Sequence, residues 1–149
     1  MAHDRLPDAK LFTLERANAM LPLVRAIVTD LSRLSRDLLE RRERLVLLLR
    51  GRDEQRADPF SAELEDVQKE FEKDSQKLRE YVDELLELGV EPKNGTEGLV
   101  DFPAIIEGRL VYLCWKLDEP EIRFWHDLEA GFAGRQQLRP QPLAADRAP

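Results

Sequence analysis

The sequence predicts an α+β domain in which a long antiparallel helical hairpin carries a small antiparallel β-hairpin or a three-stranded meander. Apolar residues recur at steps of three and four through the first half of the chain, which is typical of paired helices. Most aromatic residues lie in the second half, in β-branched and aromatic runs that indicate strands. The 149 residues suit one domain, which we expect to span 1–137, with a Pro- and Ala-rich disordered tail over 138–149.

Two helices are expected, over residues 13–50 and 59–88. Thr13 is a suitable N-cap for the first, Pro22 should kink or restart it, and Gly89 is a suitable C-cap for the second. Their apolar positions predict a coiled-coil seam. The seam residues are Val24, Ile27, Leu31, Leu34, Leu38, Leu45 and Leu48 in the first helix and Leu64, Val67, Phe71, Leu78, Tyr81, Leu85 and Leu88 in the second.

Each seam contains one charged residue, Arg41 in the first helix and Asp74 in the second. When the two seams are paired in antiparallel register, these residues fall in neighbouring layers. Two interpretations stay open: a polar pair that fixes the register, or an arginine that reaches the edge of the seam beside a solvated aspartate. Asp37, four residues before Arg41, is a competing partner for the arginine.

Charge also distinguishes the two helices. Between residues 24 and 50 basic residues outnumber acidic ones by seven to four, and between 60 and 88 acidic residues outnumber basic ones by ten to four. Opposite charge favours pairing of the helices, within one chain or between two. Because two helices alone leave apolar surface uncovered, we expect a homodimer that pairs hairpins into a four-helix arrangement.

The β-rich part is expected over residues 98–126. The Glu107–Gly108 pair suits a two-residue turn, and counting outward from it places Asp101 opposite Cys114. The opposite face of this hairpin should pack on the helices, although one bulge would exchange the two faces. Pro103 has no N–H to donate, which predicts an edge strand or an interrupted one. The residues expected on the helix-facing side are Val100, Phe102, Val111, Leu113 and Trp115.

A third strand is favoured over residues 121–126, with a short helix as the alternative. If the loop before it has three residues, His126 shares a face with Cys114, as do Ile122 and Phe124. If the loop has four residues, all three side chains point away.

Four residues of this part are of the types that bind zinc or iron: Asp101, Cys114, His126 and, in reserve, Glu129. Their spacing matches no short metal motif, such as C-x-x-C or H-E-x-x-H. The structural alternative is a buried cysteine that packs as a small apolar residue, a hydrogen-bonded histidine and solvated acids. Nucleophilic catalysis by Cys114 is a weaker hypothesis, because it needs His126 within hydrogen-bond reach.

A second candidate site involves Arg135, which ends a glycine-containing turn over residues 131–135. Backbone N–H groups and this guanidinium are able to hold an anion, although the segment lacks the context of a phosphate loop. Trp125 is the neighbouring aromatic candidate for a ligand-binding role.

Several segments resemble the bacterial proteins grouped as domain of unknown function 2203. The segments are FTLERAN at 12–18 followed by LP at 21–22, GLVDFPA at 98–104, VYLCW at 111–115, WH at 125–126 and GFAGR at 131–135. The resemblance covers residues 12–138. It implies no activity, cofactor or catalytic residue, because none is established for that family.

Composition excludes several classes of function. The net charge of -7 disfavours binding to nucleic acid or to an anionic membrane surface. No apolar run is long enough to span a bilayer, and no apolar run follows the first residues as it would in a secretory signal. A lone cysteine suits the reducing cytoplasm. We therefore expect a cytoplasmic interaction or scaffold protein, which assembles through its hairpin and binds a protein or small-molecule partner at its β-rich end. A metalloprotein or metal-dependent enzyme is the alternative, with a divalent transition metal as cofactor.

Overall fold

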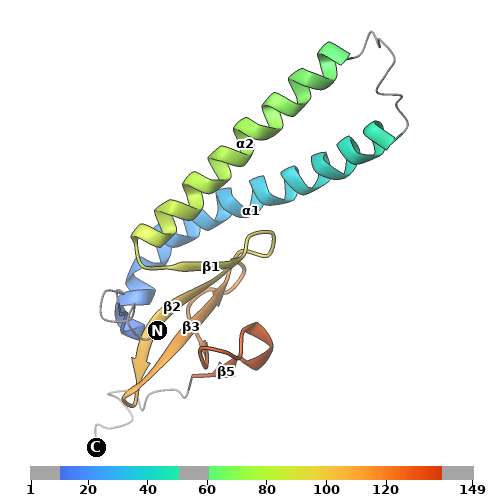
Figure 1. The fold of residues 1–149 in the computed structure, drawn as a ribbon. Helices are drawn as coiled ribbons and strands as arrows, with labels where there is room; N and C mark the ends of the chain where they lie inside the picture. Colours follow the sequence, from blue (N-terminus) through green and yellow to red (C-terminus); the bar gives the residue numbers. More distant parts are fainter. Residues whose placement is uncertain (1–10, 51–60, 139–149) are drawn as a thin grey trace, which may run out of the picture.

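The computed structural model describes residues 11–50 and 61–138 and confirms the α+β class. Two helices form a hairpin that extends from one face of a five-stranded antiparallel sheet (Figure 1). The elements in chain order are α1 (Leu14–Arg50), α2 (Ser61–Glu87), β1 (Glu91–Asn94), β2 (Leu99–Ile106), β3 (Arg109–Lys116), β4 (Phe124–His126), the short 3-10 helix η2 (Phe132–Gly134) and β5 (Gln136–Gln137). Each strand pairs with its neighbour in the chain, so the sheet is a meander. The start expected for the second helix at residue 59 and residues 139–149 of the expected tail lie outside the described residues.

Local chemistry sets the ends of the helices. The N–H of Arg16 donates to Oγ1 of Thr13 over 3.0 Å, which is the predicted N-cap. Helix α1 then continues through Pro22, so the helix does not restart at this residue, and the alternative expectation of a kink there stays a prediction. Gly89 ends α2 with a φ of 88° and donates its N–H to the carbonyl of Leu86, as a glycine C-cap does.

The core lies between the helices and one face of the sheet. The five residues predicted to face the helices are all buried there, from Val100 on β2 to Trp115 on β3. Phe12, just before α1, packs edge-on against Phe102 with ring centroids 5.2 Å apart. This face is therefore covered by the first half of α1 and the end of α2, and the opposite face of the sheet is turned away from the helices.

The β2–β3 hairpin has the predicted turn and register. Glu107 and Gly108 have φ values of 52° and 77°, which is the pair of left-handed residues that a type I′ turn requires. Asp101 accordingly pairs with Cys114 across the two strands.

Pro103 lies in an interior strand, because β2 pairs with both β1 and β3. Its carbonyl accepts the N–H of Phe12 over 2.8 Å, so the proline nitrogen also points to that side and away from β3. Strand β1 begins at Glu91, which pairs with Asp101, so its ladder with β2 does not extend to Pro103. The missing N–H therefore costs neither ladder a hydrogen bond.

The third predicted strand exists but is shorter than expected. Strand β4 covers Phe124–His126, after a connection over residues 117–123 that is longer than either loop considered. His126 pairs with Tyr112 and Phe124 with Cys114, so both share the face of Cys114. Ile122 does not: it is buried in the core under the helices, and its N–H donates to Oδ1 of Asn18.

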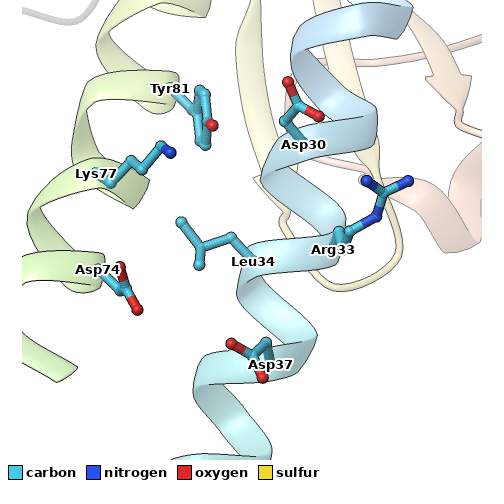
Figure 2. Close-up of a pocket in the computed structure, with 7 residues that line it drawn as sticks. All are labelled: Asp30, Arg33, Leu34, Asp37, Asp74, Lys77 and Tyr81. Atoms are coloured by element: carbon cyan, nitrogen blue, oxygen red, sulfur yellow. The ribbon is translucent and has the colours of Figure 1, made fainter. Parts of the chain in front are cut away.

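A polar bridge joins the distal half of α1 to the middle of α2. Arg41 donates to Asp74 on α2 over 2.6 Å and contacts Asp37 on its own helix at 2.8 Å. The polar-pair interpretation is thus correct, and the competing partner takes part as well. Next to this bridge the helices border a cleft of about 500 Å³ into which Leu34 points (Figure 2). The residues that line the cleft are Asp30, Arg33, Leu34, Asp37, Asp74, Lys77 and Tyr81.

No helix within residues 11–50 and 61–138 combines the length and the apolar character that crossing a membrane requires.

Candidate metal centre

Three successive strands bring Asp101, Cys114 and His126 together on the face of the sheet that is turned away from the helices. Asp101 pairs directly with Cys114, and His126 lies one ladder step further along, opposite Tyr112. The His126 side chain reaches diagonally across β3 to Asp101. All three side chains are buried, with the aspartate and the histidine 2% exposed.

One ligand atom from each residue lies within 4.8 Å of the other two. The Nε2 atom of His126 is 3.0 Å from both carboxylate oxygens of Asp101. Its Nδ1 atom is 2.7 Å from the backbone carbonyl of Asp127, an oxygen that can only accept, so Nδ1 carries a proton. This outer hydrogen bond fixes the ring and directs Nε2 at the carboxylate and the thiol, as outer-shell partners do for histidine ligands of metals.

Two protons occupy the centre of this group. One lies between Nε2 of His126 and the Asp101 carboxylate, because two lone pairs facing each other at 3.0 Å would repel. The other belongs to Cys114, whose thiol donates to Asp101. Burial, reinforced by the neighbouring Asp101 charge, raises the pKa of Cys114 to about 12, and burial also raises the pKa of Asp101.

A partly buried cation lies beside the group. Arg135 donates two hydrogen bonds to the carboxylate of Glu119, at 2.8 and 2.9 Å, and one to the carbonyl of Cys114 at 3.3 Å. Its guanidinium stacks on the rings of Phe124, 3.9 Å away, and Phe132, 4.6 Å away. Arg135 is thus committed to internal contacts that enclose the backbone of Cys114.

The other predicted site residues lie elsewhere. Glu129 is exposed in the turn after β4 and is absent from the group of converging ligand atoms. Trp125 points to the opposite, helix-facing side of the sheet, where Arg109 lies over its ring.

Sequence reasoning missed three supporting contacts: the Glu119 carboxylate on Arg135, the Asp127 carbonyl on His126, and the Glu91 carboxylate that accepts from Tyr112. The Glu119 contact had a weak signal, since its Asp-Glu-Pro setting is typical of a turn. Backbone acceptors carry no sequence signal at all.

A family model described as "Uncharacterized conserved protein (DUF2203)" matches residues 10–138, which is most of the chain. The chain therefore belongs to this family, and the resemblance noted in its sequence is confirmed. No curated protein and no solved structure matches it.

Proposed function

We propose that this member of the DUF2203 family binds a divalent transition-metal ion, zinc being the best fit, through Asp101, Cys114 and His126. The observation that carries the proposal is the convergence of one oxygen, one sulfur and one nitrogen within 4.8 Å of one another on adjacent strands. The bound ion would link β2, β3 and β4 on the face of the meander that is turned away from the helices.

Charge supports this proposal. With the two protons in place, the group of Asp101, Cys114 and His126 has no net charge, whichever side of the His126–Asp101 contact holds the shared proton. When a divalent cation replaces both protons, a carboxylate, a neutral imidazole, a thiolate and the ion again sum to zero. Replacing the two protons by one divalent ion therefore leaves the net charge of the buried group unchanged, so the group gains no uncompensated charge.

The spacing of the atoms also suits the ion. Tetrahedral zinc sets oxygen and nitrogen ligands about 3.3 Å apart and places sulfur about 3.6 Å from either, given bonds of about 2.05 and 2.3 Å. The 3.0 Å between His126 and Asp101 therefore needs to widen by only about 0.3 Å. The sulfur of Cys114 lies within 4.8 Å of both atoms and would need to lie about 3.6 Å from each in the ion-bound site.

The mixed donor set selects the class of metal. A thiolate favours zinc and other softer transition metals over magnesium or calcium, which prefer oxygen ligands alone. The reducing cytoplasm that the single cysteine suggests would keep Cys114 available as a ligand.

The direct test is the metal content of protein purified without an affinity tag. We expect about one metal ion per chain, and a cobalt-substituted protein with the visible bands of tetrahedral Co²⁺ and a near-ultraviolet thiolate-to-cobalt band. Cys114→Ser should remove the thiolate band, and His126→Gln should weaken binding of zinc at least about 100-fold.

Glu129→Gln is the matched control, because it alters a nearby but exposed carboxylate. It should leave metal content and cobalt spectrum unchanged. A folded protein that takes up neither zinc nor cobalt at micromolar concentration would contradict the proposal, and the three residues would then form a hydrogen-bonded core cluster only.

A further inference from the structure

The sheet-facing stripe of α1 continues beyond the sheet. In the first half of the helix this stripe is buried, and its members recur at steps of three and four: Ala17, Leu21, Val24 and Val28. Ser32 extends it and donates to the carbonyl of Thr96, in the loop at the end of the sheet. Further along the helix, the same spacing leads to Leu39, Arg42, Val46 and Leu49.

This distal part of the stripe is open in the described residues. Leu39 is 49% exposed and Val46 is 42% exposed, and Leu47 and Leu49 beside them are exposed as well. A shallow groove of about 500 Å³ follows the same surface. Its lining residues are Leu39, Arg42, Glu43, Val46, Leu47 and Arg50.

We propose that a second copy of this chain covers this surface, with the distal halves of the two α1 helices packed antiparallel about a two-fold axis between Arg42 and Glu43. In this register Leu39 lies opposite Val46 of the other copy, and Arg42 lies opposite Glu43 of the other copy. The two-fold axis repeats both pairs, so two apolar contacts flank two ion pairs.

The order of the residues supplies the charge complementarity on which this choice rests. A two-fold interface must match a surface to itself, and the sequence Leu39, Arg42, Glu43, Val46 does so when it is reversed. A partner other than a second copy would have to present the same order of apolar, basic, acidic and apolar residues along one helix face. The acidic α2 helix lacks it, because acidic residues dominate its charged positions.

The dimensions also fit. The segment from Ser35 to Arg50 is about 24 Å long at 1.5 Å per residue. The tip of each helix would then reach the other copy near Ser35, beside its Gly95–Thr96 loop. The two sheets would lie at opposite ends of the assembly, where they do not collide.

The first test replaces an apolar contact. Analytical ultracentrifugation should find a dimer at micromolar concentration, and Val46→Asp should raise the dissociation constant at least about 100-fold, because each dimer would have to bury two carboxylates. Leu86→Asp is the control: Leu86 is also an exposed leucine, on α2, and this change should leave the dimer intact. A monomeric original chain, or a dimer insensitive to Val46→Asp, would overturn the proposal.

The second test exchanges the charges. Arg42→Glu and Glu43→Arg, each alone, place like charges opposite each other and should weaken their own homodimers about 10-fold. A mixture of these two variants should form the heterodimer in preference to either homodimer, and the doubly exchanged variant should regain the original dissociation constant. Random pairing in the mixture would overturn the antiparallel register, since each variant is otherwise an ordinary surface change.

Discussion

Asp101→Asn separates a metal ligand from a purely structural residue. In the metal-free protein the amide has the shape of the carboxylate, donates to Nε2 of a neutral His126 and accepts from the thiol of Cys114. No buried polar group loses its partner, so the free energy of unfolding without metal should fall by no more than about 1 kcal/mol. The amide lacks the negative charge that the cation needs, so binding of zinc should weaken at least about 100-fold.

The size of the effect follows from linkage. Zinc at 100 times the original dissociation constant stabilises the folded chain by about 2.7 kcal/mol, which corresponds to a rise of about 8 °C in Tm for a chain of this length. For Asp101→Asn the same zinc concentration would only equal the weakened dissociation constant, and the gain would be about 0.4 kcal/mol.

Urea unfolding, followed by tryptophan fluorescence with zinc or with a chelator, measures both quantities, because Trp115 is buried in the core. Glu129→Gln should retain the full gain of the original chain. An equal zinc gain in the original chain and in Asp101→Asn would refute the assignment of Asp101 as a ligand. A loss of several kcal/mol without metal would instead show that the carboxylate is required by the fold itself.

Three further outcomes are expected. Gly98→Ala should lower the free energy of unfolding by about 3 kcal/mol, because Gly98 has a φ of 68° and a Cβ there would lie 2.7 Å from a side-chain carbon. Gly108→Ala is the control, because its Cβ would meet open space, and it should cost about 1 kcal/mol. Equal losses for the two variants in urea titrations would contradict this expectation. Asp74→Ala should lower the free energy of unfolding by about 1 kcal/mol, because it removes one partner of Arg41. The double variant with leucine in place of both Arg41 and Asp74 should be at least as stable as the original chain. A double variant less stable than Asp74→Ala would disprove the reasoning. With a pKa of about 12, the thiol of Cys114 should react with a thiol-specific dye at pH 7 about 1,000 times more slowly in the native protein than in urea, and similar rates would show that it is accessible.

The core of the β-region was predictable because one turn determined it. Glu107–Gly108 admits a two-residue connection, and the alternation of side chains along each strand then sets every pair from Ile106–Arg109 to Asp101–Cys114. The short edge strands β1 and β5 were not predicted. Strand β1 contains a proline and an asparagine, residues that strands generally avoid, and pairing with β2 overrides that local preference.

The convergence of the candidate site was only half predictable. The turn places Asp101 beside Cys114, but the position of His126 depends on the path of residues 117–123. Irregular contacts decide that path: Trp115 donates to the carbonyl of Glu119, four residues later, and Ile122 enters the core beside α1. Neither contact belongs to a periodic sequence pattern from which the position of His126 could be counted.

The polar bridge between the helices shows the opposite case. Arg41 and Asp74 interrupt two otherwise apolar seams, and antiparallel register places them in neighbouring layers. The sequence left open whether they pair, and the structure shows that they do. The homodimer expected from uncovered apolar surface stays a prediction, and the surface proposed for it above differs from the one that the seam pattern indicates. The seam pattern predicts contacts on the face between the two helices, whereas the exposed stripe with Leu39 and Val46 continues the sheet-facing side of α1.

The order in which the strands follow one another has a consequence for folding. Strands β2, β3 and β4 lie within residues 99–126 and close through one tight turn and one connection. Docking of the helices requires Phe12 to reach Ala104, which closes a loop of most of the chain. Because short loops close at lower entropic cost, the meander should assemble before the helices pack on it. An ion captured at this early stage would accelerate folding of the whole chain, and the effect would appear in refolding rates measured with and without zinc.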